Sequence, residues 1–343
     1  MKHKNIAIFV PHAGCPYQCA FCDQHTITSQ TELPDGGDVE RICREAFAQI
    51  DDLSETEIAF FGGSFTAIPR AYMLELLDAA KPFAAVCKGL RISTRPDCIS
   101  REVLDILQSY HVTAIELGAQ SLDDAVLLAN DRGHTAADVF AASALIREYG
   151  FELGLQIMPG LYGADALSDQ NTAEAVCGIR PDTVRIYPVV ILQDTRLGEL
   201  YTAGIYRPIP FAEMVQRVAE WCVLYCSHGI RIIKVGLHAS EFVGSKALGG
   251  YYHPAFRELC AAYGFRAKIE AGITASHREK RQITVFVHPT CISQAVGQKR
   301  SNIRYFHEKY GISLTVVGDE AISPSAVRIA EESCKGGIND DRK

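Results

Sequence analysis

Three cysteines near the N-terminus are the residues of this sequence best suited to chemistry. Cys15, Cys19 and Cys22 lie in "GCPYQCAFCDQ" with the spacing C-x3-C-x2-C, and Phe21 precedes the third. A disulfide would leave one thiol over, and structural zinc takes four protein ligands, usually in two separated pairs. A cubane iron–sulfur cluster is normally held by four cysteines. Three cysteines would leave one iron open to an outside ligand, and an open, redox-active iron can do chemistry.

Mononuclear zinc stays open as an alternative. His12 and His25 flank the cysteine motif and would complete a set of four ligands, although the sequence has no second C-x2-C pair. Cys222 and Cys226 lie four residues apart on a predicted helix with His228 nearby. Buried structural cysteines are the favoured interpretation of that pair.

The composition is that of a globular protein. Of 343 residues, 48% are hydrophobic and 22% are charged. The apolar run at the N-terminus is too short to span a membrane and lacks a small-residue cleavage site. We therefore expect a cytoplasmic protein with no membrane partner. Thiols stay reduced in that compartment, so closely spaced cysteines indicate a metal rather than disulfides.

Six short apolar runs alternate with helical patterns along the first part of the chain. The expected strands are 5–12, 57–63, 89–96, 112–121, 151–160 and 183–192. Helical patterns occupy 38–50, 69–86, 100–110, 122–129, 135–149 and 170–178. Near-continuous apolar runs are typical of strands buried on both faces, and βα alternation implies a parallel sheet. The sequence thus predicts an α/β fold with an open, partial (βα)6 barrel, whose active site lies at the carboxyl ends of the strands.

The cysteine loop, C-x3-C-x-Φ-C after an apolar strand, resembles that of the radical S-adenosylmethionine (SAM) enzymes. The resemblance implies that Cys15, Cys19 and Cys22 hold a 4Fe–4S cluster whose open iron chelates SAM, with Phe21 beside the cofactor. A reduced cluster then cleaves SAM to methionine and a 5′-deoxyadenosyl radical, which abstracts hydrogen from a substrate. An electron donor such as flavodoxin or ferredoxin is implied as a partner.

Further cofactor-binding candidates follow the expected strands. They are Gly62, Gly63, Ser64 and Phe65 after the second strand, Arg95 after the third, and Gln120, Ser121 and Arg132 after the fourth. The resemblance makes the first four the glycine-rich motif for the methionine amino group of SAM, with serine in place of the usual Glu or Thr. Gln120 and Ser121 suit a ribose, and either arginine suits a carboxylate. The alternatives are a tight βα turn at the glycines and a solvated charge at Arg95.

The motifs are most similar to the radical SAM half of the Elongator catalytic subunit and its bacterial relatives. "FFGGSFTAIP", "STRPD", "ELGAQSLDDAVL", "NDRGHT" and "MPGLYG" occur in that order, and the resemblance runs from about residue 5 to 260. The remaining residues have no room for the acetyltransferase domain of that family. The oxygen-independent coproporphyrinogen oxidases share several motifs and are the nearest rival.

The last part of the chain has a basic character. Residues 264–310 carry nine Lys or Arg and three acidic residues, a net charge of +6 in a chain whose net charge is −7. The stretch 281–320 predicts a strand, a helix–turn–helix and a second strand. Its turn "VGQKRSNI" (296–303) resembles the KH-domain loop that clamps nucleic-acid backbone, with Arg300 where the second glycine would be. The residues expected to bind RNA are Gly297, Gln298, Lys299, Arg300 and Arg304; a charged surface turn is the alternative.

These observations predict four segments. They are a radical SAM partial barrel at 1–240, a connecting region at 241–263, a small basic KH-like α+β module at 264–330 and a disordered tail at 331–343. The favoured substrate is a nucleoside in tRNA or other RNA. Small-molecule radical chemistry of the coproporphyrinogen oxidase type is one alternative, and a non-enzymatic, metal-bound RNA-binding protein is another.

Overall fold

The computed structural model describes residues 4–11, 15–23, 32–237, 241–273 and 282–330. The chain divides into two compact units, Met1–Phe256 and Arg257–Lys343. This division lies between the two boundaries, after 240 and after 263, that the sequence analysis placed around a connecting region. No helix of the described residues combines the length and the apolar character needed to cross a bilayer.

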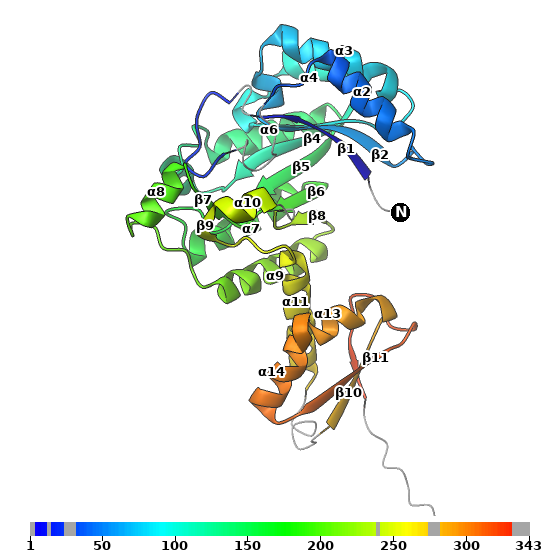
Figure 1. Cartoon of the computed structure of the whole chain (residues 1–343), viewed down its shortest axis with the longest axis vertical. Helices are drawn as coiled ribbons and strands as arrows, with labels where there is room; N and C mark the ends of the chain where they lie inside the picture. The colour runs from blue at the N-terminus through cyan, green and yellow to red at the C-terminus, as the bar shows by residue number, and fades with distance from the viewer. Residues whose placement is uncertain (1–3, 12–14, 24–31, 238–240, 274–281, 331–343) are drawn as a thin grey trace, which may run out of the picture. The chain divides into compact units, whose positions relative to one another are not determined.

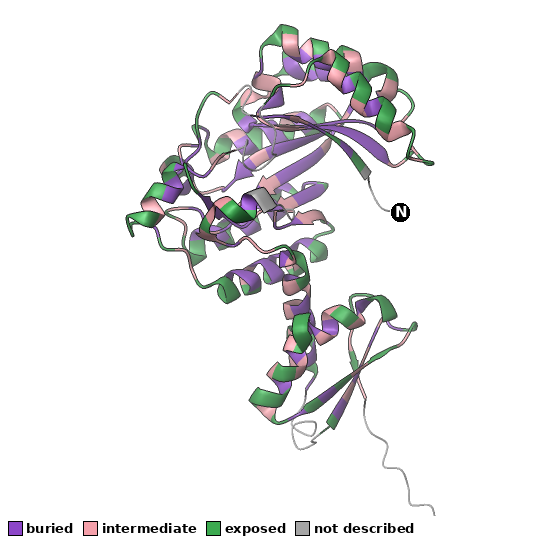
Figure 2. Cartoon of the chain, in the orientation of Figure 1, coloured by how far each residue is buried: buried purple, intermediate pink, exposed green. Residues whose placement is uncertain are grey.

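Seven of the described strands form one parallel sheet, in the order β1-β2-β3-β4-β5-β6-β8. Their bounds are Lys4–Val10, Thr56–Gly62, Gly89–Thr94, Val112–Gln120, Glu152–Ile157, Thr183–Ile186 and Arg231–Val235. Neighbours in the chain are neighbours in the sheet, as βα units with crossovers of one hand require. The sheet curls into a half-barrel (Figure 1), and its strands are largely buried (Figure 2). The predicted α/β partial barrel is confirmed.

Helices join the strands and pack against the sheet (Figure 1). The longer ones are α2 Gly36–Phe47, α3 Arg70–Ala84, α4 Arg101–Ser109, α6 Ala136–Glu148, α7 Ala166–Ile179 and α9 Phe211–Ser227. The shorter ones are η1 Phe65–Ala67, η2 Pro96–Cys98, α5 Asp124–Ala129, α8 Arg196–Thr202 and α10 Glu241–Lys246. Asp35, Thr135 and Asp165 form capping boxes that satisfy the first amides of α2, α6 and α7. These polar residues therefore fix where the three helices begin.

Two features of the sheet differ from the prediction. The single strand expected at 183–192 is two strands, because Pro188 lacks the amide that would continue the ladder. The second half, β7 Val190–Leu192, pairs antiparallel with β9 Ala247–Gly250. The sheet also has a seventh strand, β8, which the sequence analysis missed. Its residues "RIIKV" are mostly partly exposed, so this edge strand lacks a continuous apolar run.

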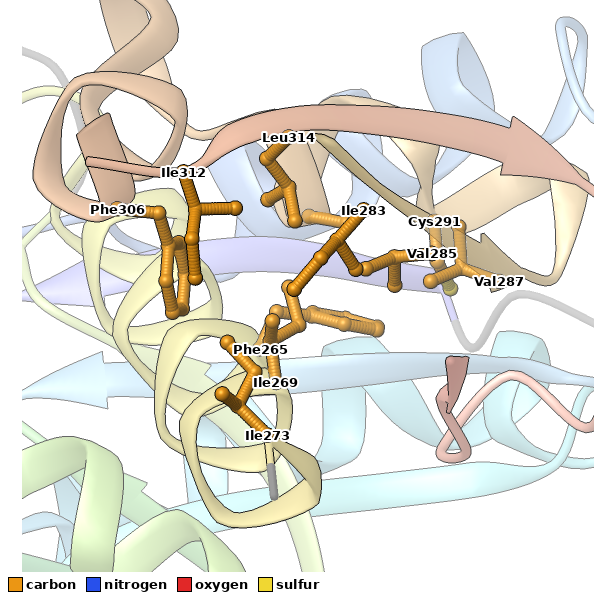
Figure 3. Packing of buried hydrophobic residues seen from close by; sticks show 11 residues of the cluster. Phe265, Ile269, Ile273, Ile283, Val285, Val287, Cys291, Phe306, Ile312 and Leu314 are labelled. Carbon is orange, nitrogen blue, oxygen red and sulfur yellow. The ribbon is translucent and has the colours of Figure 1, made fainter. Parts of the chain in front are cut away.

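The second unit has its own core. Helix α11 Phe256–Gly272, the short η3 Pro289–Cys291, α13 Ile292–Val296, η4 Gln298–Arg300 and α14 Ser301–Tyr310 accompany a sheet of order β11-β10-β12. Its strands are β10 Gln282–Val287, β11 Ser313–Gly318 and β12 Arg328–Ile329. Apolar side chains from α11, α14 and the strands interdigitate in Figure 3. The predicted strand, helix–turn–helix and strand are confirmed.

The interior of the half-barrel holds a buried ion network centred on Arg91 of β3, whose side chain is fully buried. Its Nε donates to Glu57 of β2 (2.6 Å), Nη1 to Glu116 of β4 (3.1 Å) and Nη2 to Glu152 of β5 (2.6 Å). Glu116 also accepts from Nε of Arg185 on β6 at 2.6 Å. Each buried carboxylate is thereby paired, and strands β2 to β6 are linked side by side.

We predict that Arg91→Met lowers the free energy of unfolding by about 3–5 kcal/mol, because it leaves buried carboxylates without their shared cation. Urea denaturation followed by circular dichroism measures this change. Arg101→Met is the matched control, since it breaks the exposed Arg101–Glu148 pair and should leave the denaturation midpoint nearly unchanged. Equal midpoints for the two variants would show that the network does not stabilise the fold.

Candidate functional site

A cavity of about 380 Å³ lies at the carboxyl ends of the parallel strands. This volume is in the range of small-molecule sites. Residues at or just beyond the ends of successive strands line it, among them Gly62, Arg95, Gln120, Met158 and Tyr187. The predicted position of the site, at the carboxyl edge of the sheet, therefore coincides with a cavity.

The three cysteines of the N-terminal motif all line this cavity. The amide of Cys22 donates to the carbonyl of Cys19 at 3.0 Å, which closes a turn between the last two. Burial raises the pKa of Cys22, and the neighbouring thiols of Cys19 and Cys15 raise it further. Burial also raises the pKa of Cys15, partly offset by the backbone amide of Ser64. The thiols of Cys15 and Cys22 therefore stay protonated at neutral pH until a metal replaces the proton.

The arrangement of the thiols bears on the choice of metal. Among the described residues, no three Cys, His, Asp or Glu side chains converge closely enough to hold one metal ion. In a cluster each thiolate binds a different iron, so the three thiols need not converge on one ion. His12 and His25, the histidines of the zinc alternative, lie outside the described residues.

A loop after α5 clamps the cysteine loop in place. The amide of Ala20 donates to the carbonyl of Asn130 at 3.1 Å. Gly133 has φ +69°, and a Cβ there would lie 2.4 Å from the ring of Tyr17. The side chain of Arg132 donates from Nη1 to Sγ of Cys19 at 3.0 Å. The segment 130–133 thus holds the cysteine loop through backbone, packing and side-chain contacts.

The glycine pair after β2 has a structural reason and a place in the site. Gly62 has φ +111°, and a Cβ there would lie 2.9 Å from the carbonyl oxygen of Val10. The amide of Gly63 donates to that same oxygen at 2.8 Å. The glycines do form the tight βα turn of the alternative interpretation, and both also line the cavity. The turn brings Ser64 beside Cys15.

Unpaired polar atoms test whether SAM fits here. Ser64 Oγ, Arg95 Nη1 and Arg132 Nε are buried and have no hydrogen-bond partner among the described residues, and all three residues line the cavity. An unpaired buried donor or acceptor costs roughly 1–3 kcal/mol. A carboxylate would accept from a guanidinium, and a hydroxyl can bond an amino or carboxylate group. The residues present therefore fit the methionine end of SAM.

Most of the predicted cofactor-binding residues are brought together. Those that line the cavity are Phe21, Gly62, Gly63, Ser64, Arg95, Gln120 and Arg132. Gln120 has the rare φ of +64°, and its Oε1 accepts from Gln156 Nε2 at 3.3 Å. A side chain held at such a backbone conformation often serves a functional site.

Phe65 and Ser121 are not among the described residues that line the cavity. Phe65 is buried against Phe60, with ring centroids 4.6 Å apart. Ser121 accepts from the amide of Asp123 at 3.1 Å and lies 3.3 Å from the hydroxyl of Thr172. The predicted hydrogen bond from Ser121 to a ribose is not supported by this geometry, and the contact predicted from the motif containing Phe65 stays a prediction. Phe65 instead packs beneath the turn that carries Gly62–Ser64, and Ser121 fixes the turn that follows Gln120.

The sequence analysis missed the wall formed by β4, β6 and β8. Glu116, Arg185, Tyr187 and Lys234 all line the cavity there. The Arg185 guanidinium lies over the ring of Phe61, 5.0 Å from its centroid. Burial raises the pKa of Tyr187, so its hydroxyl stays protonated at neutral pH. The sequence does mark part of this wall: in "RIYP" (185–188), Arg185 and Tyr187 place polar groups at every second position of an otherwise apolar stretch.

The turn expected to bind RNA joins α13 to α14 in the second unit. Gly297 has φ +78°, which favours glycine, and a Cβ there would lie 2.3 Å from Oγ of Ser301. Lys299 and Arg300 have φ of +51° and +61°. Arg300 thus adopts the conformation that the second glycine of a KH loop would favour. Gln298, Lys299, Arg300 and Arg304 are exposed.

Asn302 fixes the helices on either side of that turn. It is buried, and its amide nitrogen donates to the carbonyls of Ala262 at 2.9 Å and Ala295 at 3.0 Å. These bonds tie the start of α14 to α11 and to α13. The basic turn is therefore held on a defined scaffold in the second unit.

Comparisons with known proteins agree with this geometry. The model of the radical SAM superfamily matches residues 9–170, and that of the radical SAM C-terminal domain matches residues 181–263. The chain is 28% identical over 251 residues to the tRNA uridine(34) acetyltransferase of Dehalococcoides mccartyi strain CBDB1, covering 63% of this chain and 55% of that protein. It is 28% identical over 196 residues to human Elongator complex protein 3, covering 49% of this chain and 35% of that protein.

The fold also matches a solved structure, that of the archaeal Methanocaldococcus infernus Elp3 lacking residues 1–46. The TM-score is 0.61 at 17% identity, and the match covers 90% of this chain and 68% of that chain. The chain spans about half the length, or less, of the two relatives above. Similarity to these relatives therefore does not by itself assign their complete activities to this chain.

We predict that Gly133→Ala displaces Tyr17 and loosens the cysteine loop, so that the protein loses most of the iron bound on anaerobic reconstitution. Gly150→Ala is the matched control, because Gly150 has a similar φ of +80° but nothing within 4 Å of the added Cβ. The left-handed backbone alone costs about 1–2 kcal/mol in either variant. Iron assays that find equal iron in both would mean that the clamp does not hold the loop.

Proposed function

Because the chain belongs to the radical SAM superfamily, we propose that it is an enzyme that cleaves SAM at a 4Fe–4S cluster held by Cys15, Cys19 and Cys22. The observation that carries the proposal is the meeting of three thiols, a glycine turn and two arginines in one cavity. When bound, the cluster and SAM supply a 5′-deoxyadenosyl radical that abstracts hydrogen from a substrate.

The chain's own residues would bind and orient SAM and keep water away from it. Ser64 and Arg95 each offer an unpaired buried polar atom to the amino and carboxylate groups of SAM. Gln120 and Gln156 offer amide groups from neighbouring strand ends, suited to ribose hydroxyls. Apolar side chains of Phe9, Phe61 and other residues line part of the wall and disfavour water there. A dry, closed site limits side reactions of a carbon radical.

A nucleoside in tRNA or other RNA is the substrate that we favour. Two observations support it: curated relatives carry the name tRNA uridine(34) acetyltransferase, and the second unit presents exposed cations on a glycine turn between two helices. The proposal does not extend to acetyl transfer. It includes a one-electron donor such as flavodoxin or ferredoxin, and a cytoplasmic location where RNA and reduced thiols occur.

Two alternatives predict different outcomes in one set of assays. An enzyme of the coproporphyrinogen oxidase type would cleave SAM but would not retain RNA through purification. A non-enzymatic, metal-bound RNA-binding protein would retain RNA but would not cleave SAM. Mass spectrometry of RNA from a deletion strain, compared with its parent, identifies a missing modified nucleoside.

We predict about four irons per chain after anaerobic reconstitution, as a cubane requires. The reduced protein should convert SAM to 5′-deoxyadenosine and methionine. Changing Cys15, Cys19 and Cys22 to Ala should abolish the brown colour and this product, whereas Cys87→Ala, at a thiol remote in sequence from the motif, should retain both. A cluster retained in the triple variant would overturn the proposed ligands.

We predict that Lys299→Gln with Arg300→Gln weakens tRNA binding and reduces its salt dependence. Two lost phosphate contacts should lower the slope of log affinity against log salt by about 1.4–1.8. Arg41→Gln with Arg44→Gln removes the same charge from exposed α2 and serves as control. Filter binding over a range of salt concentrations measures both. If the two double variants bind alike, the basic turn is structural and the RNA substrate loses this support.

A further inference from the structure

Arg132 contacts the cysteine loop through its charged end. Its Nη1 donates to Sγ of Cys19 at 3.0 Å, and its Nη2 donates to the carbonyl of Gly118 at 2.6 Å. The side chain is 5% exposed. The guanidinium is therefore held against a thiol that the proposed function makes a ligand of iron, rather than turned to solvent.

The surrounding loop fixes this orientation. Asp131 and Gly133, on either side, have φ of +54° and +69°. The carbonyl of Arg132 accepts from the guanidinium of Arg95, which itself pairs with both oxygens of Asp97 at 2.9 Å. Backbone and neighbouring side chains thus hold the Arg132 guanidinium between Cys19 and the carbonyl of Gly118.

We propose that Arg132 is a redox-tuning residue, whose N–H···S hydrogen bond to Cys19 raises the reduction potential of the cluster. This inference rests on the proposed function, in which Cys19 binds iron. It adds a role for Arg132 to the carboxylate contact that the sequence analysis predicted. Nη1 and Nη2 already donate to the protein, and a carboxylate can still accept from the unpaired Nε while the bond to Cys19 is kept. Arg95 likewise keeps one unpaired buried nitrogen, Nη1, while its Nε and Nη2 pair with Asp97.

The direction of the effect follows from charge. Reduction adds one electron from the external donor to the cluster and forms or breaks no bond. The reduced cluster is more negative by one charge, and that charge is shared with the thiolate sulfurs. A cationic donor on one sulfur stabilises the reduced form more than the oxidised form. Hydrogen bonds to such sulfurs are among the features that set cluster potentials.

A redox titration monitored by electron paramagnetic resonance, on the reconstituted full chain without SAM, tests the proposal. Arg132→Met removes the donor and the charge while keeping an unbranched chain. We expect the reduced-to-oxidised ratio at a fixed potential to fall at least threefold, which is about 30 mV at 59 mV per tenfold change for one electron. Arg185→Met removes another cation of the same cavity that has no contact with Cys19, and should shift the potential less.

Every outcome of this experiment either supports or overturns the proposed role of Arg132. A potential equal to that of the parent overturns the proposal, and weaker SAM binding at an unchanged potential returns Arg132 to the SAM carboxylate. If Arg132→Met takes up no iron, Arg132→Gln, a neutral donor, is titrated instead, with a smaller negative shift expected. If neither variant takes up iron while Arg185→Met does, Arg132 builds the loop and does not tune it. Failure of the parent to form a cluster would instead refute the proposed function.

Discussion

The fully buried guanidinium of Arg91, shared by carboxylates from the strands on both sides of β3, is the constraint on which the site depends. Glu57, Glu116 and Glu152 each accept from it, and Glu116 passes the link on to Arg185. A strand shifted by one residue would turn its partner to the opposite face and leave a charge buried alone. The network therefore fixes the register of the strands whose ends carry the cavity.

The register determines which side chains enter the cavity. On β4, Glu116 lies in the network, and Gly118 and Gln120 follow at two-residue intervals along the same face. Arg185 on β6 and Tyr187 just after it repeat that interval. Gly118 leaves room where a Cβ would lie 2.9 Å from Nε2 of Gln120. The charged interior and the ligand-binding rim are thus successive layers of one face of the sheet.

Much of the fold and part of the site could be predicted from the sequence, because the signals were local. The cysteine spacing, the glycine pair and the first five strands each occupy a few consecutive residues. The wall containing Glu116 and Arg185 escaped notice because their pairing joins residues 69 positions apart. Strand β8 was missed because an edge strand carries a weaker apolar pattern. Ser121 was assigned to the cavity because position after a strand does not reveal the direction of a side chain.

The charges of the cavity suggest how its two ends differ. Arg95 and Arg132 lie with the cysteine loop, where three thiolates and a reduced cluster would bring negative charge. Arg185 and Lys234 line the wall formed by β6 and β8, where Glu116 is the acidic side chain among the described lining residues. Burial and the nearby guanidinium groups of Arg132 and Arg95 lower the pKa of His134 to about 4, which keeps that imidazole neutral. The positive charge at the cysteine end therefore comes from Arg95 and Arg132, which stay charged at any working pH. Near neutral pH, the environment offered to the cluster does not vary with the protonation of His134.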